Sequence, residues 1–297
     1  MGSVQQGPAG AFKWISSRRC GRNFAYLSMA DRGASSSGAL SRKLGHFAPL
    51  SVEDVQILDN LGTSDEHFEA HRDIVAEGEV PRSMFVLKEG MACRYRILPD
   101  GRRQIITFLI PGDLCDLHVF LLKAMDHSIA ALTPVRLAAV SRDQLMDLAV
   151  SRPRVSAALR WSTMQEEAML RERIVSLGRR DARGRLAYLL CELLWRYQAI
   201  DMVEDHTFRL PLTQLELADT LGLTPVHVNR VLQNLRRQGM LILEHRTMVL
   251  LDVDSLQEIA QFNSNYLHLG GAPEEVRRFF ERLELERQHG RASTEAS

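Results

Sequence analysis

Long apolar segments are missing from this sequence. None of its uninterrupted apolar runs, in 297 residues, approaches the roughly 18 residues of a membrane-spanning helix. The first forty residues are rich in Gly, Ser, Ala and Arg and lack the continuous apolar stretch of a secretory signal peptide. We therefore expect a cytoplasmic protein with no membrane contact.

Cysteine is scarce, and its few positions are widely separated. The chain has four, Cys20, Cys93, Cys115 and Cys191. They form no C-x-x-C pair and lack the accompanying His spacing of zinc or iron–sulfur ligands. His67 and His71 would share a face if they lay on a helix, but no further ligand completes a metal site there. We predict reduced thiols, no metal and no evident cofactor.

Signatures of common enzyme sites are also missing. The sequence contains no Gly-rich phosphate loop, no G-x-S-x-G elbow and no H-E-x-x-H zinc motif. The segment "LGRRDARGRL" has glycines without a strand-loop-helix pattern around them. We predict that the protein is not an enzyme.

Charge of either sign is not in excess. The 37 Lys and Arg residues balance the 37 Asp and Glu residues, so any contact with nucleic acid must come from a local basic patch. Hydrophobic residues at 45% and charged residues at 25% are typical of soluble domains. The length favours about two domains.

One local basic segment is present, "LTPVHVNRVLQNLRRQGML", which begins at residue 223. Its apolar residues recur at i, i+3, i+4 and i+7, which predicts a helix with one buried face: Val228, Val231, Leu232 and Leu235. Thr224 is suited to cap this helix, Pro225 to its first position and Gly239 to its end. The other faces then carry side chains that hydrogen-bond well: His227, Asn229, Arg230, Gln233, Asn234, Arg236 and Arg237.

A second helix is predicted just upstream, in "LTQLELADTLGLT". Thr213 and Glu216 have the spacing of a capping box, and Gly222 permits a tight turn before the basic helix. Its apolar set is Leu217, Ala218 and Leu221. Two short helices joined by such a turn form the helix-turn-helix unit, whose second helix enters the DNA major groove. The alternative is a basic helix that is only solvated.

Downstream, "MLILEHRTMVLLD" has two β-rich runs around a polar break, which predicts a hairpin. With the two helices it makes a winged helix, in which His245 or Arg246 at the hairpin tip would contact the phosphate backbone. The alternative is a hairpin that serves only for edge packing.

Between about residues 68 and 145 the pattern changes to short apolar runs separated by turn signals such as Glu89-Gly90 and "PDGR". Many short strands in sequence predict a small sandwich or jelly-roll barrel, either enclosing a ligand or filled by its own side chains.

A long helix is predicted next, in "PRVSAALRWSTMQEEAMLRERIVSLG", from Pro153 to near Gly178. A four-and-three spacing predicts a coiled-coil seam: Ala157, Trp161, Met164, Ala168, Arg171 and Val175. A second stripe is expected to pack on its own subunit: Leu170, Ile174 and Leu177. The alternative is a helix buried within a monomer.

In this order, barrel, long helix and winged helix resemble the Crp/Fnr family of transcription regulators over roughly residues 41 to 260. The resemblance is carried by "EGEVPRSMFVLKEGMACRYRILPDGRRQIITFLIPGDL", "DARGRLAYLL" and "LTQLELADTLGLTPVHVNRVLQNLRRQGML". It implies an α+β fold with an N-terminal jelly-roll β-barrel sensor domain, a long dimerisation helix and a C-terminal winged helix-turn-helix. The parts it implies are the cyclic-nucleotide-binding-like barrel (41–150), the dimerisation helix (151–180) and the DNA-binding domain (181–260). Composition predicts in addition a disordered tail (1–40) and a charged C-terminal extension (261–297).

The sensor positions depart from the family's cyclic-AMP-binding pattern. Family members use a Gly-Glu pair for the ribose and an Arg-Ser pair for the cyclic phosphate, and aligned from Gly112-Asp113 these fall on Asp116-Leu117 and His127-Ser128. Leu117 cannot accept a hydrogen bond, and Asp116 would repel a phosphate. The chain also has one cysteine before the barrel, where the oxygen-sensing members have a group of cluster ligands. Neither cyclic AMP nor an iron–sulfur cluster is therefore expected.

For DNA reading, the family's recognition helix carries a Glu and an Arg four residues apart. Here Arg230 matches the Arg, which would bind guanine, while Val226 replaces the Glu and offers only apolar contact. Asn229 has the chemistry to bind adenine. The DNA-binding candidates are Thr224, His227, Asn229, Arg230, Gln233, Arg236 and Arg237.

The expected function is a homodimeric regulator that binds a palindromic operator under control of an unidentified small-molecule signal at the barrel, with double-stranded DNA as partner and RNA polymerase as a further candidate partner. The alternative is a small-ligand-binding module whose C-terminal domain mediates protein interaction.

Overall fold

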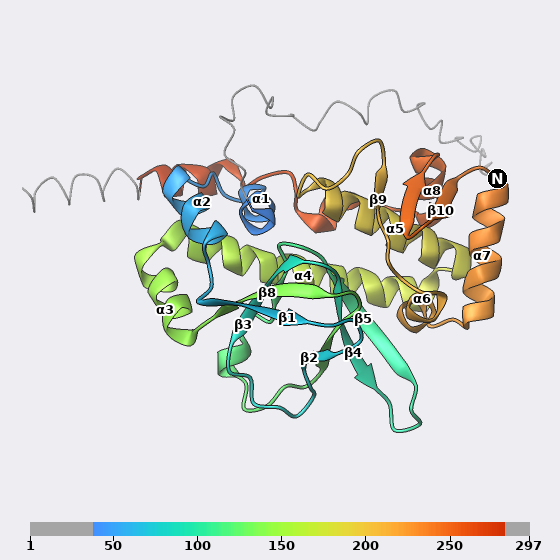
Figure 1. The fold of residues 1–297 in the computed structure, drawn as a ribbon. Helices are drawn as coiled ribbons and strands as arrows, with labels where there is room; N and C mark the ends of the chain where they lie inside the picture. Colours follow the sequence, from blue (N-terminus) through green and yellow to red (C-terminus); the bar gives the residue numbers. More distant parts are fainter. Residues whose placement is uncertain (1–37, 283–297) are drawn as a thin grey trace, which may run out of the picture. The chain divides into compact units, whose positions relative to one another are not determined.

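The structure is a computed structural model, and it describes residues 38–282, without the side chain of Val119. Most of the predicted N-terminal tail, including Cys20, lies outside the described residues, as does 283–297. The described part contains two small sheets of four strands, a long helix, and a bundle of helices with a three-stranded sheet (Figure 1). This confirms the predicted mixed fold.

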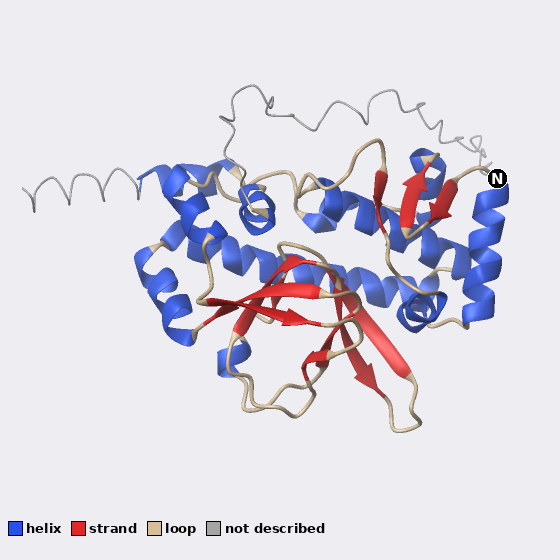
Figure 2. Cartoon of the chain, viewed as in Figure 1, coloured by secondary structure: helices blue, strands red, loops and turns tan. Residues whose placement is uncertain are grey.

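The strands of residues 64–140 form two antiparallel four-stranded sheets, coloured red in Figure 2. One has the order β1 (Ser64–Phe68), β8 (Val135–Val140), β3 (Met84–Glu89) and β6 (Leu114–Cys115). The other has the order β2 (Asp73–Val75), β7 (Ser128–Ala131), β4 (Ala92–Ile97) and β5 (Arg103–Leu109). The two sheets are hydrogen-bonded separately, so the expected barrel is a two-sheet roll and is not closed.

Turn chemistry sets the hairpins of the roll. Gly90 has a φ of +89°, and a Cβ there would lie 2.4 Å from the carbonyl oxygen of Pro134, so a glycine is required between β3 and β4. The idea that His67 and His71 share a helix face is wrong, because His67 lies on β1 and His71 in the following turn, where its φ is +63°. Among the described residues no group of three metal-ligating side chains occurs.

Short helices flank the roll. They are α1 (Ala39–Gly45), α2 (Val52–Asp59), the 3-10 turn η2 (Val119–Leu121) and α3 (Arg142–Ser151). Ser51 and Ser141 begin α2 and α3 with complete capping boxes, which satisfy backbone N–H groups at each start.

The long helix α4 (Pro153–Arg179) forms as predicted, but its faces differ from the expectation. Trp161 and Ala168 of the predicted seam are buried in the chain's own core, where Trp161 stacks on Phe47 with ring centroids 5.4 Å apart. Leu170 and Ile174, expected to pack on their own subunit, are 40% and 72% exposed. Their assignment was wrong because helical spacing alone does not say which of two apolar stripes meets the roll.

The C-terminal half follows α4. Its helices are α5 (Ala182–Gln198), α6 (Gln214–Leu221), α7 (Pro225–Arg237) and α8 (Val253–Ala260). Its sheet has the order β10 (Leu241–Glu244), β11 (Thr247–Leu250) and β9 (Thr207–Arg209). The 3-10 turn η3 (Ser264–Leu267) then packs on α4 and α5 with Leu267 fully buried, and residues 274–282 are helical.

A single apolar cluster joins the roll to the C-terminal half. It contains Cys93, Tyr95 and Ile105 from β4 and β5 together with Leu190 of α5 and Leu217 of α6. A second cluster fills the interior of the roll and includes Trp161 of α4. The first cluster therefore positions the helix-turn-helix against one sheet of the roll.

Candidate nucleic-acid interface

Helices α6 and α7 form the predicted helix-turn-helix. Thr213 accepts a hydrogen bond from the backbone N–H of Glu216, whose side chain closes the capping box of α6. Gly222 ends α6 with a φ of +63°, the left-handed conformation that glycine adopts without strain. Thr224 caps α7 by accepting from the N–H of His227. These local signals set the short turn between the two helices.

The buried face of α7 is the predicted one. Val228 and Leu235 are fully buried, and Val231 and Leu232 nearly so. Burial of each such side chain contributes about 1.5–3 kcal/mol, which fixes the rotation of α7 about its axis. The opposite face of the helix is thereby turned to solvent.

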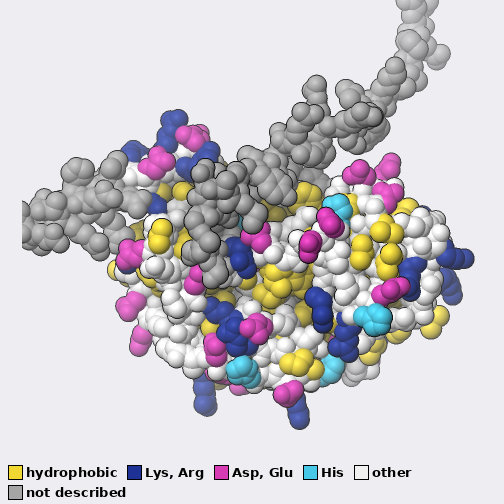
Figure 3. All heavy atoms as spheres, turned by 45° about the horizontal axis from the view of Figure 1, so that its top comes forward, with side chains coloured by type: hydrophobic (Ala, Val, Ile, Leu, Met, Phe, Trp, Pro, Cys, Tyr) yellow, Lys and Arg dark blue, Asp and Glu magenta, His cyan; other side chains and the backbone are white. Residues whose placement is uncertain are grey.

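That exposed face carries the predicted DNA-binding side chains. Thr224, His227, Arg230, Gln233 and Arg237 are exposed, and Asn229, Asn234 and Arg236 are half-buried. Within residues 38–282, Arg230 forms no hydrogen bond or ion pair, so its guanidinium is available to an external partner. Figure 3 shows Lys and Arg side chains at the right-hand edge, where Figure 1 places α7.

The predicted wing is the hairpin of β10 and β11. Glu244 pairs with Thr247 across a two-residue turn of His245 and Arg246, whose φ angles are +48° and +62°. Positive φ at both positions gives the turn type that matches the strand twist of a hairpin. Both side chains are exposed at the tip, where a phosphate backbone beside α7 would lie.

Polar contacts join α6 to the roll. The guanidinium Nε of Arg103 on β5 donates to the carboxylate of Asp219 at 2.8 Å, and Gln104 donates its side-chain amide to the Thr220 carbonyl at 3.3 Å. The helix-turn-helix thus contacts the β5 strand of the roll directly. Sequence reasoning did not find this contact, because nothing in either segment indicates the other.

The four sensor candidates lie in the roll near β6 and β7, but they form no common ligand set. The imidazole of His127 is 3.2 Å from the carboxylate of Asp116 and 2.7 Å from that of Asp126. Burial lowers the pKa of His127, but the contacts with the two carboxylates outweigh burial, and its pKa is raised. Ser128 accepts from the backbone N–H of Glu77, and Leu117 is half-buried.

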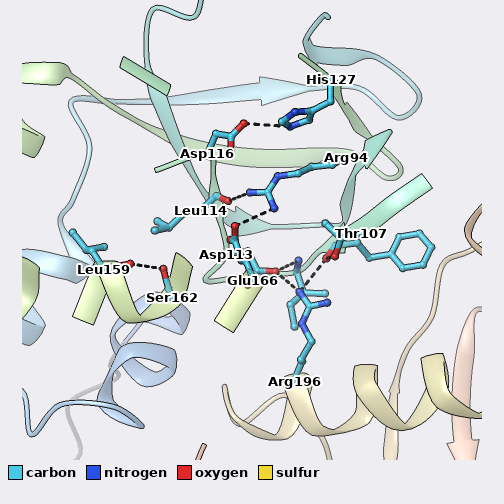
Figure 4. Close-up of polar contacts among 12 residues, drawn as sticks. Arg94, Thr107, Asp113, Leu114, Asp116, His127, Leu159, Ser162, Glu166 and Arg196 are labelled. Atoms are coloured by element: carbon cyan, nitrogen blue, oxygen red, sulfur yellow. Dashed lines mark hydrogen bonds and ion pairs between the residues drawn. The ribbon is translucent and has the colours of Figure 1, made fainter. Parts of the chain in front are cut away.

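A buried arginine, which sequence reasoning missed, occupies the interior beside them (Figure 4). Arg94 on β4 lies 3.2 Å from the carboxylate of Glu166 on α4 and donates to the Leu114 carbonyl at 2.9 Å. The cation of the roll interior is therefore already paired with a carboxylate from the long helix. No sequence spacing relates residues 94 and 166, so only the tertiary fold reveals the pair.

A second buried ion cluster, also missed, centres on Asp113 in the turn before β6. Its carboxylate accepts from Lys43 of α1 at 2.8 Å, from Arg196 of α5 at 2.6 Å and from the backbone N–H of Ile110 at 2.8 Å. Burial acts to raise the pKa of Asp113, but the two cations lower it below its usual range. The cluster links α1, the roll and α5.

The comparisons with known proteins agree with this architecture. Residues 184–259 match the family model described as a Crp-like helix-turn-helix domain, and residues 65–152 match that of a cyclic nucleotide-binding domain. The nitrogen fixation regulation protein FixK of Azorhizobium caulinodans is 30% identical over 207 residues, which cover 70% of this chain and 82% of the relative. This chain belongs to the Crp/Fnr family.

Other Crp/Fnr members show the same likeness. The transcriptional activator protein FnrL of Cereibacter sphaeroides is 30% identical over 210 residues, which cover 69% of this chain and 82% of that protein. The solved structure of FixK2 from Bradyrhizobium japonicum has a TM-score of 0.60 at 27% identity and covers 66% of this chain and 96% of its own. As a Crp/Fnr member, this chain is a transcription regulator with a DNA-binding helix-turn-helix. In the described range 38–282, no helix is long and apolar enough to cross a bilayer.

Proposed function

We propose that this regulator is a cytoplasmic homodimer that reads a two-fold symmetric operator through Arg230 and its neighbours on α7. The observation that carries the proposal is the exposed face of α7, on which Arg230 has no partner within the described residues. The planar guanidinium matches the O6 and N7 acceptors of guanine. Asn229 has the amide chemistry for adenine, and His227 and Gln233 are further base or phosphate contacts.

Thr224, Arg236 and Arg237 are assigned to phosphates. They lie at the two ends of α7, where they would fix the register of the helix on the duplex. Arg246 at the wing tip would contact the backbone on the other side. These contacts carry affinity without sequence preference, while Arg230 carries the preference.

The dimer is assigned to the exposed apolar face of α4. Met164, Leu170, Ile174 and Val175 are between 40% and 72% exposed on one long helix. Two copies packed along this face would cover these side chains and place two α7 helices for successive major grooves, about 34 Å apart. An isolated helix-turn-helix would read only half of such a site.

The roll does not bind cyclic AMP in this proposal: the protein responds to a different ligand or to a signal that is not a small molecule. Leu117 cannot accept from a ribose hydroxyl, Asp116 would repel a cyclic phosphate, and Arg94 is already neutralised by Glu166. The pair of Arg94 and Glu166 joins the roll to α4, so any ligand that broke it would act on the proposed dimer helix.

The test is selection of fragmented genomic DNA by the purified full-length protein at near-physiological salt, followed by sequencing. Enrichment of a symmetric motif with half-sites about one helical turn apart is expected. Uniform recovery that is lost with rising salt would show contact with phosphates alone and contradict the proposed reading of sequence. No recovery would favour a ligand-binding module whose C-terminal half contacts protein.

A further inference from the structure

An apolar side chain lies exposed in the first turn of α7. Val226 is 70% exposed, although the side chains around it on this face are polar. The packing of α7 does not use it, because the buried stripe consists of four other residues. The start of the helix does not use it either, since Thr224 caps the helix and Pro225 occupies its first position. A single exposed apolar side chain is ordinary by itself, but Val226 shares its face with Arg230 and would therefore meet whatever that face binds.

The position of Val226 relative to Arg230 is fixed by the helix. Residues four apart lie one above the other on a helix face, with about 5–6 Å between their Cβ atoms. Neighbouring base pairs are about 3.4 Å apart along the duplex. A helix whose N-terminal turn faces the base edges therefore brings Val226 and Arg230 to adjacent base pairs.

Val226 is also rigid and uncharged. A β-branched side chain in a helix holds one strongly preferred χ1 rotamer, so its two methyl groups are fixed before DNA binds. The first turn of α7 contains no acidic residue, so no carboxylate competes for Arg230 or accepts from a base there. In the major groove the apolar group available to such a side chain is the 5-methyl group of a pyrimidine.

We propose that Val226 reads the 5-methyl group of a pyrimidine next to the guanine that Arg230 binds. The proposal rests on the proposed DNA-reading function and names a specificity-determining residue within it. Thymine and 5-methylcytosine present the same methyl group, whereas cytosine lacks it and presents an N4 donor that valine cannot accept. A carboxylate at this position would accept from that donor, so V226E should move the preference toward cytosine.

The experiment replaces thymine by uracil, which removes the methyl group and leaves the pairing edge unchanged. In an operator selected by the wild-type protein, each thymine of a half-site is replaced in turn, and the dissociation constant is measured by titration. We expect an effect at one position only, next to the guanine whose recognition depends on Arg230. Uracil there should raise the dissociation constant about four-fold when one half-site is changed and about fifteen-fold when both half-sites are changed. V226A keeps only one methyl group and should show a smaller difference between the thymine and uracil operators than the wild type.

A matched variant controls for general effects on the helix-turn-helix. Leu215 on α6 is 55% exposed, so L215A removes a comparable apolar surface from the same unit. It should keep the full discrimination between thymine and uracil. Because Val226 and Leu215 are both exposed, neither variant should alter the thermal unfolding midpoint by more than a degree or two.

A third arm distinguishes the two sources of the methyl group. Cytosine at the same position should weaken wild-type binding. The operator with 5-methylcytosine there should bind about four-fold more tightly than the operator with cytosine. Restoration equal to the thymine operator would show that cytosine methylation alone suffices for recognition. Equal binding of cytosine and 5-methylcytosine would overturn the proposal, because it would show that the methyl group is not read.

Two other outcomes would also overturn it. The first is that uracil has no effect at any position, and the second is that a purine is selected beside the guanine that depends on Arg230. Either result would contradict the role of Val226, while selection of a symmetric site would still support the proposed regulator. Failure to select any symmetric sequence would instead contradict the proposed function, and the reading by Val226 would fail with it.

Discussion

The guanidinium of Arg196 on α5 lies 2.6 Å from the carboxylate of Asp113 in the roll, and both side chains are buried. Lys43 of α1 holds the other carboxylate oxygen at 2.8 Å. Arg196 is also 3.9 Å from Glu192, which accepts from Arg173 of α4 at 3.3 Å. The DNA-binding half, the long helix and the roll are thus joined by buried charges.

Asp113→Asn should destabilise the fold by about 3–5 kcal/mol, because it leaves the cations of Lys43 and Arg196 buried with no carboxylate between them. Urea unfolding monitored by circular dichroism measures this. Asp100→Asn, at an exposed turn of the roll, is the control and should have little effect, because its ion pair with Arg102 is solvated. Equal effects of the two variants would contradict a structural role for the buried cluster.

The carboxylate of Asp113 should also make the free energy of unfolding depend on pH. Because the pKa of Asp113 is lowered in the folded protein, its stabilisation is fully present above the unfolded value near 3.9 and is lost as pH falls through the folded value. The free energy of unfolding should therefore decrease below about pH 4. This decrease should be smaller in Asp113→Asn, measured by urea unfolding at pH 7, 4 and 3. A variant with the wild-type pH profile would show that other carboxylates cause the loss.

Arg230→Ala should weaken operator binding by about 1–3 kcal/mol and remove the preference for guanine at one position of each half-site. Arg237→Ala, on the same exposed side of α7, is the matched control, since a phosphate contact weakens binding to all sequences and lowers the salt slope by about one. Titrations of the operator and of base-substituted operators, at several salt concentrations, separate the two. If Arg230→Ala left base preference intact, guanine reading would belong to another residue.

Ile174→Glu should separate the proposed dimer, because it puts a charge into the exposed apolar face of α4, where Ile174 is 72% exposed. Val150→Glu changes an apolar side chain of α3 that is 79% exposed and should leave the association unchanged. Sedimentation equilibrium gives the mass of each variant. Dimers of Ile174→Glu would contradict the assignment of this face.

Cyclic AMP should not raise the thermal unfolding midpoint. A ligand that binds only the folded state stabilises it by about 2.7 kcal/mol at 100 times its dissociation constant, so binding would be visible in a thermal melt. No shift is expected, because Arg94 is paired with Glu166 and Leu117 cannot accept from ribose. A concentration-dependent rise would show that the Arg94–Glu166 pair opens for a nucleotide.

Much of the DNA-binding half was predictable, because its signals are local. The capping of α6 by Thr213, the left-handed Gly222 and the buried stripe with Val228 each depend on residues within a few positions of one another. The same holds for the hairpin turn at His245. Element type and the exposed face of α7 therefore followed from spacing alone.

The roll and its contacts with the helices were less predictable, because these contacts are long-range. Arg94 meets Glu166, and Asp113 meets Arg196, over more than seventy residues of sequence. The two apolar stripes of α4 had the same helical spacing, and the one that contains Trp161 is the buried one, with Trp161 stacked on Phe47 after α1. Such pairings depend on the three-dimensional arrangement, which no local pattern records.

The spacing of the operator tests the central claim most directly. In the symmetric site selected by the protein, five base pairs are inserted between the half-sites, which rotates one by about half a helical turn relative to the other. The account predicts that affinity falls to that of a single half-site, because two α7 helices held by one dimer cannot reach opposite faces of the duplex. Unchanged affinity would contradict a dimer that reads both half-sites at once.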